Sequence, residues 1–143
     1  MPELLLDGAD EAIDARGLVS DVGSEVRILH IDDDPDFADI VATYLQRERA
    51  YFEVTTETDS QAALDRLADL DVDCVVSDYE MPKLNGLDLL QAVRDERPTL
   101  PFILFTGKGS EEIASEAISH GVTEYLQKTS GTNQYEVLAN RIE

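Results

Sequence analysis

The chain has 143 residues, of which 43% are hydrophobic, so it is long enough and apolar enough to fold around one core. Its 31 acidic residues against 11 basic ones give a formal net charge of −20, which disfavours direct binding to nucleic acid or to anionic lipid. The same charge favours a halophilic source, because salt screens the self-repulsion.

The sequence carries few signals for disulfides, membrane spans or export. Cys74 is the only cysteine, so an intrachain disulfide or a multi-cysteine metal site is excluded, and a small buried core residue is expected. No stretch approaches the roughly 20 apolar residues of a membrane span, and the start does not have the pattern of a signal peptide. We therefore expect a cytoplasmic protein without membrane contact.

The first part of the chain has weak patterning. Residues 1–25 carry scattered Gly and Asp and are expected to be a weakly structured extension. Regular periodicity starts at Val26, and residues 26–143 are expected to form the domain proper. The final helical pattern runs to Glu143 without a capping residue, which is typical of a domain truncated in its last helix.

The first half of the domain alternates strand and helix patterns. VRILHI (26–31) is a β-branched apolar run that predicts a buried strand. Pro35 opens a helix with apolar residues at helical spacing, and Asp34 is placed to cap it. A second strand is predicted over 51–58 and a second helix over 61–70.

The second half continues the alternation. Apolar runs predict strands over 72–77, 100–105 and 123–127. Helices are predicted over 87–97, 111–120 and 134–143, with Gly121 ending the second of them.

The resulting (βα)₅ order predicts a parallel α/β sheet with helices on both faces, that is, a three-layer sandwich. A closed (β/α)₈ barrel needs about 250 residues, so an open doubly wound sheet is expected. In such sheets ligands bind beyond the carboxyl ends of the strands.

Polar residues gather at these predicted strand ends. Asp32, Asp33 and Asp34 follow the first strand and Asp78 follows the third. Clustered carboxylates raise one another's pKa unless a cation compensates them, and oxygen-only ligands indicate Mg²⁺. Helix capping and turn formation are the alternative role for the run, but they require only one of its three aspartates.

Thr106 at the fourth strand end and Lys128 after the fifth complete the set. A carboxylate nucleophile, a metal, a hydroxyl and a lysine together suit a site that accepts a phosphoryl group as an aspartyl phosphate.

The pattern resembles the receiver domain of two-component response regulators, a flavodoxin-like fold with strand order 2-1-3-4-5. The matching segments are IDDDP at 31–35, SDYEMPKLNG at 77–86, FTGKGS at 105–110 and YLQK at 125–128. The likeness extends from about residue 26 to the end. The chain is also similar to haloarchaeal receivers, including those fused to sensor (PAS) and histidine kinase domains.

The resemblance implies a role for each matching residue. Asp78 would be the phosphorylated residue, and Mg²⁺ would be bound by Asp33, Asp78 and the backbone carbonyl of Glu80, with Asp32 acting through water. Thr106 and Lys128 would hold the phosphoryl group.

Tyr125 matches the aromatic switch position of the family, which turns inward as Thr106 moves toward the phosphate. The alternative is an ordinary half-buried strand aromatic with its hydroxyl at the surface. One departure from the family lies nearby: Thr129 follows Lys128 where the family usually has a proline after a cis bond. The isomer of this bond is left open by the sequence.

Two residues flank the implied phosphate site. Glu80 and Lys108 each lie two positions past a key residue, and an ion pair between them would alter water access and phosphate lifetime. Two solvated side chains are the alternative.

Several weaker signals are rejected. GKGS at 107–110 lacks the spacing of a nucleotide-binding loop. His30 is expected to be a strand residue with a satisfied hydrogen bond, and His120 to place a favourable charge at a helix end.

Three functions are candidates for this pattern of residues. The first is a receiver that takes phosphate from a histidine kinase or phosphotransfer domain and is no enzyme beyond its own phosphorylation and dephosphorylation. The second is a Mg²⁺-dependent phosphatase or phosphotransferase with an aspartyl-phosphate intermediate, although Glu80 stands where such enzymes typically place an acid/base Asp. The third, a flavin protein, conflicts with the three aspartates after the first strand.

The resemblance leads to the receiver and implies that its partner surface lies at about 111–143, where a homodimer or further domains of the same chain are open alternatives.

Overall fold

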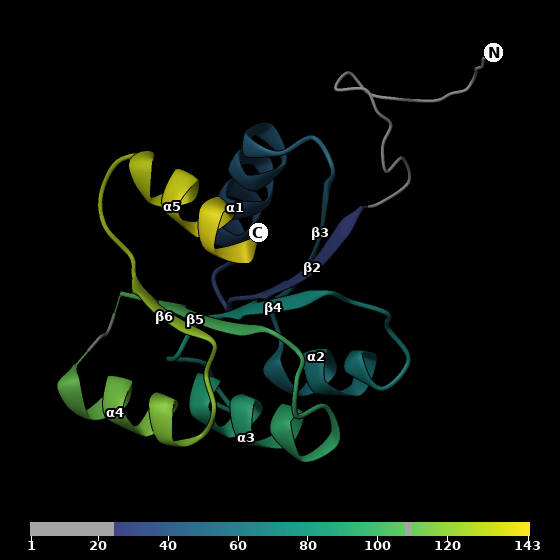
Figure 1. Ribbon diagram of the computed structural model, residues 1–143, viewed down its shortest axis with the longest axis vertical. Helices are drawn as coiled ribbons and strands as arrows, with labels where there is room; N and C mark the ends of the chain where they lie inside the picture. Colours follow the sequence, from purple (N-terminus) through teal and green to yellow (C-terminus); the bar gives the residue numbers. More distant parts are fainter. Residues whose placement is uncertain (1–24, 108–109) are drawn as a thin grey trace, which may run out of the picture.

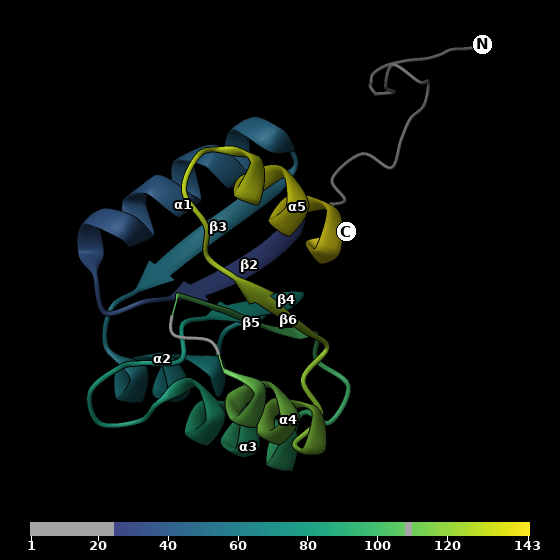
Figure 2. The same ribbon diagram turned by 90° about the vertical axis from the view of Figure 1, so that its left-hand side faces the viewer.

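Residues 25–107 and 110–143 are described by a computed structural model, and they form one five-stranded parallel sheet between two helical layers (Figure 1). The strand order is β3-β2-β4-β5-β6, which in chain order is the predicted 2-1-3-4-5. Helices α1 and α5 cover one face, and α2, α3 and α4 cover the other (Figure 2). The predicted doubly wound α/β fold is confirmed. Of the predicted extension 1–25, residues 1–24 lie outside the described part.

The strands are short and their burial follows their place in the sheet. Their bounds are β2 Val26–Ile31, β3 Phe52–Glu57, β4 Cys74–Ser77, β5 Phe102–Thr106 and β6 Glu124–Gln127. Every residue of the inner strands β4 and β5 is buried, whereas the edge strands β3 and β6 are mostly half-buried. Inner strands of a parallel sheet are covered on both faces, which explains their continuous apolar runs.

Four of the five described helices start where a polar side chain accepts from their first amide groups, whereas Thr132 makes no such contact at the start of α5. The helices are α1 Pro35–Glu48, α2 Ser60–Leu67, α3 Gly86–Glu96, α4 Glu111–Ser119 and α5 Asn133–Ile142. Asp34 caps α1 as predicted, accepting from the amides of Asp36 and Phe37, and Asp59 caps α2 in the same way. Asn85 and Asp88 form a reciprocal capping box on α3.

The predicted second helix, 61–70, is too long at its end. Helix α2 stops at Leu67, and the Arg97 guanidinium donates to the carbonyls of Leu67 (2.7 Å) and Leu70 (3.3 Å). These contacts satisfy carbonyl groups at the helix end from a residue far along the chain, so no local pattern announces the boundary.

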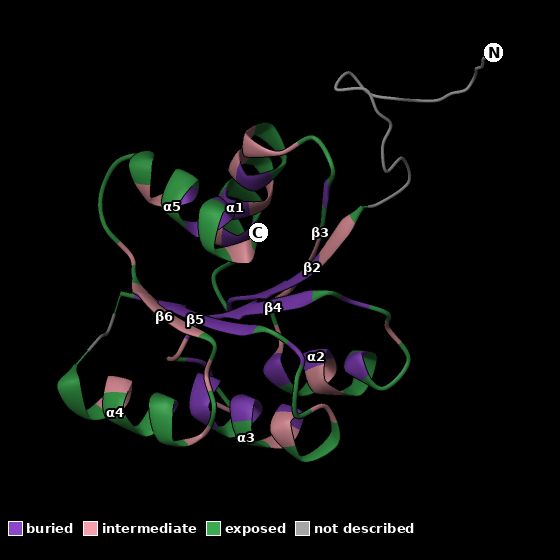
Figure 3. Ribbon diagram, in the orientation of Figure 1, coloured by how far each residue is buried: buried purple, intermediate pink, exposed green. Residues whose placement is uncertain are grey.

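Two apolar layers form the core, one on each face of the sheet, and the inner strands β4 and β5 are buried between them (Figure 3). Leu29 and Ile31 face the α2–α4 side, and Ile28 faces the α1–α5 side, as the two-residue period of a strand requires. Cys74 lies in the second layer, so the prediction of a small buried core residue is confirmed, and burial raises the pKa of its thiol to about 12. None of the described helices has the length and apolar character needed to cross a membrane.

Candidate functional site

Two strand ends bring the predicted aspartates together. Strands β2 and β4 are neighbours with Ile31 opposite Ser77, so the residues that follow them, Asp32 and Asp78, leave the sheet side by side. The amide of Asp78 donates to the Ile31 carbonyl at 2.9 Å and keeps the acceptor strand paired to its last residue. The chain order reverses between β2 and β4, which is where open α/β sheets bind ligands.

Three carboxylates form a cluster there. One oxygen from each of Asp32, Asp33 and Asp78 lies within 4.8 Å of the others. Asp32 is 1% exposed and Asp78 8%, while Asp33 is exposed. Desolvation raises the pKa of Asp33, and the charges of Asp32 and Asp78 raise it further. This excess of negative charge on hard oxygen ligands fits a divalent cation such as Mg²⁺.

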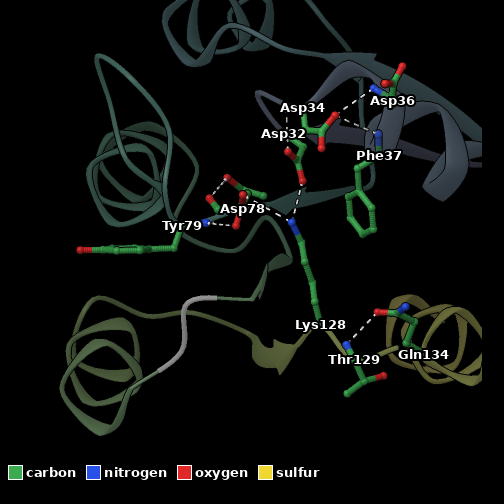
Figure 4. A network of polar contacts seen from close by, with 10 residues as sticks. Asp32, Asp34, Asp36, Phe37, Asp78, Tyr79, Lys128, Thr129 and Gln134 are labelled. Carbon is green, nitrogen blue, oxygen red and sulfur yellow. Dashed lines mark hydrogen bonds and ion pairs between the residues drawn. The ribbon is translucent and has the colours of Figure 1, made fainter. Parts of the chain in front are cut away.

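Lys128 contacts two members of the cluster (Figure 4). Its Nζ lies 2.8 Å from Oδ2 of Asp32 and 3.4 Å from Oδ2 of Asp78. The sequence placed Lys128 at the phosphoryl site but did not predict its shorter contact with Asp32. The ammonium also lies 4.2 Å from the ring centroid of Phe37, a cation–π contact that the sequence analysis did not predict.

The backbone after β6 sets the position of Lys128. Its amide donates to the Thr106 carbonyl at 2.9 Å, which extends the β5–β6 pairing by one residue. The next amide, that of Thr129, donates to Oε1 of Gln134 at 3.0 Å, and the Gln134 amide group donates to the Gly131 carbonyl. A side chain at the start of α5 thus anchors the loop at the position where Thr129 replaces the expected proline.

Asp78 is held by its own neighbours. Its Oδ1 accepts from the Tyr79 amide at 2.7 Å, and the Ser77 hydroxyl donates to its carbonyl at 2.8 Å. Gly86 packs so tightly that an added Cβ would lie 2.4 Å from the Asp78 carbonyl oxygen and 2.9 Å from the Tyr79 Cα. A side chain at position 86 would therefore displace the backbone of Asp78.

The cluster opens into a recess of about 560 Å³. Its lining residues are Asp32, Asp33, Asp34, Asp78, Glu80, Met81, Pro82 and Lys128. The predicted metal residues and Lys128 thus share one cavity with Glu80.

Thr106 and Tyr125 lie on the adjoining strands. Thr106 is the last residue of β5 and is fully buried. Tyr125 lies on β6, opposite Leu104 of β5. The Tyr125 hydroxyl is buried and has no hydrogen-bond partner among the described residues. The alternative that placed this hydroxyl at the surface is therefore wrong, and the switch role stays a prediction.

His30 lies two residues before the cluster and is 1% exposed. Its Nδ1 has no hydrogen-bond partner in the described part of the chain, so the expected satisfied hydrogen bond is wrong for this atom. Burial and the nearby Lys128 charge lower the pKa of His30 to about 3, against a smaller opposing effect of Asp78. The ring is therefore neutral at physiological pH.

Two further predictions have different outcomes. His120 follows the last residue of α4, as expected, and its Nε2 lies 3.3 Å from the Gln91 amide nitrogen. Glu80 is exposed at the rim of the recess, while Lys108 lies outside the described residues, so their ion pair stays a prediction.

Comparison with known sequences gives one family. Residues 28–140 match the response regulator receiver domain. The chain is 39% identical over 98 residues to the transcriptional regulatory protein FixJ of Bradyrhizobium diazoefficiens, covering 68% of this chain and 47% of FixJ. It is 34% identical over 101 residues to the response regulator SaeR of Staphylococcus aureus, covering 71% of this chain and 43% of SaeR. The match spans less than half the length of these curated relatives.

Solved structures agree with this match. The chemotaxis response regulator CheY4 of Vibrio cholerae is similar with a TM-score of 0.75 and 26% identity, over 84% of this chain and 100% of that one. The response regulator TrrA of Thermotoga maritima, in complex with Mg²⁺–BeF, is similar with a TM-score of 0.72 and 25% identity, over 82% of this chain and 99% of that one.

Proposed function

Because the chain belongs to the response regulator receiver domain family, we propose that Asp78 accepts a phosphoryl group from a phosphohistidine of a histidine kinase or phosphotransfer domain. One observation carries this proposal: Asp78 joins Asp32, Asp33 and Lys128 at the sheet edge where the strand order reverses. The cognate histidine kinase or phosphotransfer domain would act in the cytoplasm.

The residues present fit a Mg²⁺ ion, for which the carboxylate cluster supplies hard oxygen ligands. Asp33, Asp78 and the Glu80 carbonyl would hold the ion directly. Asp32 already accepts from Lys128 and from the Asp34 amide at 3.0 Å, which suits a role through water. When bound, Mg²⁺ would neutralise charge on the cluster and on the incoming phosphoryl oxygens.

The transfer itself is a displacement at phosphorus. A carboxylate oxygen of Asp78 forms the new P–O bond, the P–N bond of the phosphohistidine breaks, and its electron pair leaves with the imidazole. Lys128 would pair with one phosphoryl oxygen, since its Nζ already reaches Oδ2 of Asp78. The Thr106 hydroxyl would donate to another.

The response would pass through Thr106 and Tyr125 to the surface of α4, β6 and α5. Only Ala117 of α4 is fully buried, so few core contacts oppose a shift of this helix. That surface would contact a downstream domain, such as a sensor or kinase module of the same chain, or a second copy in a homodimer. The net charge of −20 opposes direct contact with nucleic acid by this domain.

The competing phosphatase or phosphotransferase is not favoured, because the matching family and its curated relatives are regulators. We therefore assign no chemistry beyond phosphorylation and dephosphorylation of Asp78. An ion pair of Glu80 with Lys108 at the site mouth would tune how long the phosphate lasts.

The test is the intact mass of the protein after incubation with acetyl phosphate and Mg²⁺ at high salt. We expect a gain of one phosphoryl group, with no gain in Asp78→Asn or in EDTA. No gain in folded, Mg²⁺-binding wild-type protein would withdraw the role of Asp78.

A further inference from the structure

Ser60, the first residue of α2, contacts the loop that carries the acceptor although it lies on a different element. It is 2% exposed. Its hydroxyl donates to the Pro82 carbonyl at 2.9 Å and accepts from the Leu84 amide at 3.1 Å. One buried hydroxyl thus satisfies two backbone groups of the loop between β4 and α3.

The residue between these two contacts has an unusual backbone. Lys83 has a φ of 72°, the only positive φ at a non-glycine among the described residues. Such a conformation is uncommon outside glycine and asparagine and persists only when surrounding contacts enforce it. The Ser60 hydroxyl binds the residues on both sides of Lys83, and the Lys83 ammonium lies 2.8 Å from Oδ2 of Asp59.

The loop fixed in this way includes the proposed metal carbonyl. Glu80, Met81 and Pro82 line the same recess as Asp33 and Asp78. At its far end, the loop is closed by the Gly86 amide, which donates to the Tyr79 carbonyl at 2.7 Å. The segment from Tyr79 to Gly86 is therefore tied at both ends, and Ser60 holds its middle.

We propose that Ser60 is a positioning residue for the phosphoacceptor site: its hydroxyl holds the acceptor loop, the segment from Tyr79 to Gly86, in the shape that presents the Glu80 carbonyl to Mg²⁺. This rests on the proposed function. Outer contacts that orient metal ligands are typically worth about 10- to 100-fold in metal affinity. The Ser60 hydroxyl acts on the Glu80 carbonyl only through Met81 and Pro82, so we expect an effect on Mg²⁺ affinity at the low end of that range.

The test compares wild type with Ser60→Ala and, as a matched control, with Ser115→Ala at an exposed serine of α4. Calorimetry should show Mg²⁺ binding about 10-fold weaker in Ser60→Ala and unchanged in Ser115→Ala. Phosphorylation by acetyl phosphate should need a correspondingly higher Mg²⁺ concentration, but should reach a rate within about 2-fold of wild type at saturation. Without Mg²⁺, the Leu84 amide should exchange its hydrogen faster in Ser60→Ala.

A second variant separates positioning from general loss of stability. Asparagine tolerates positive φ, so Lys83→Asn in the Ser60→Ala background should recover part of the Mg²⁺ affinity. Unchanged Mg²⁺ affinity in a folded Ser60→Ala protein would overturn the proposal, and so would weaker binding with no recovery in the double variant. If wild type binds Mg²⁺ but takes no phosphoryl group, the proposed function fails, while the affinity comparison still decides the role of Ser60.

Discussion

At the scale of single residues, the site is a balance of three carboxylates against one ammonium. Lys128 offsets the charge of Asp32, which is almost fully buried, and reaches Asp78. Asp33 has no cation this close in the described structure, and desolvation, followed by the charges of Asp32 and Asp78, raises its pKa. In the Mg²⁺-free protein the cluster therefore has excess negative charge, and this residual repulsion is what a bound cation would relieve.

Replacing Lys128 with Gln separates these effects. We expect the Mg²⁺-free Lys128→Gln protein to lose about 3 kcal/mol of unfolding free energy, because buried Asp32 loses its charged partner. In the wild type this pair is only slightly screened by solvent, since the Lys128 side chain is mostly buried. Mg²⁺ should bind more tightly, since a competing cation is gone, while phosphorylation becomes slower. Denaturant melts measure the unfolding free energy, calorimetry the Mg²⁺ affinity and mass spectrometry the phosphorylation rate. Arg141→Gln, which removes an exposed ion pair, is the surface control. Weaker Mg²⁺ binding in Lys128→Gln would contradict this balance.

Ionisation of Asp33 makes both the stability of the Mg²⁺-free fold and Mg²⁺ binding depend on pH. A raised folded-state pKa means that the folded Mg²⁺-free protein holds this proton more readily than the unfolded chain, so ionised Asp33 weakens the fold above that pKa. As pH falls through the folded pKa, this penalty disappears and Mg²⁺ binding weakens. Asp33→Asn should thus stabilise the Mg²⁺-free fold at neutral pH by less than about 1 kcal/mol, because the site is exposed and screened.

Thermal melts with and without Mg²⁺ test the Asp33 variant, with Asp39→Asn on exposed helix surface as the matched control. Stabilisation by Mg²⁺ should vanish in Asp33→Asn and persist in Asp39→Asn. A Mg²⁺-free Asp33→Asn protein less stable than wild type would show that the carboxylate does not repel its neighbours.

At the scale of elements, the sheet and the loops that leave it decide where each group lies. The convergence of Asp32, Asp78 and Lys128 was predictable, because parallel strands end at one edge and the strand patterns were clear. The Asp32–Lys128 pair and the Phe37 contact were not, because side-chain direction beyond a strand end has no periodic signal. Arg97 binds carbonyl groups at the end of α2, and Ser60 binds the acceptor loop. Both contacts join residues that are far apart in the sequence, and single-sequence patterns do not predict such contacts.

Replacing Gly86 tests how tightly the start of α3 packs against the backbone that follows β4. Glycine to alanine inside a helix normally stabilises it, yet here the new Cβ would meet backbone atoms of Asp78 and Tyr79. Gly86→Ala should therefore cost about 2 kcal/mol of unfolding free energy and slow phosphorylation by moving Asp78. At Gly107 the nearest atoms would lie 3.8 Å away, so Gly107→Ala should be milder in denaturant melts. Equal stability of Gly86→Ala and wild type would refute the steric argument.

At the scale of the whole molecule, the charge of −20 sets the conditions in which the domain is stable. The screening length falls from about 10 Å at 0.1 M salt to about 3 Å at 1 M, so repulsion across the surface weakens strongly over that range. This repulsion depends on composition alone and not on the site.

The melting temperature should therefore rise from 0.1 M to 1 M KCl at neutral pH. Differential scanning calorimetry measures this rise, and sucrose at matched viscosity is a control for solvent effects unrelated to charge. A melting temperature that is flat or falls with salt would rule out self-repulsion as the limiting factor and weaken the expectation of a halophilic source.

Locating the modified residue shows whether Asp78 itself carries the phosphate. Borohydride reduces an acyl phosphate to an alcohol, so treatment after phosphorylation should convert one aspartate into homoserine, visible by peptide mass mapping. We expect homoserine at position 78 only, and only when Mg²⁺ was present during phosphorylation. Homoserine at Asp32 or Asp33 instead, or at no position in a protein that has gained a phosphoryl group, would contradict this expectation.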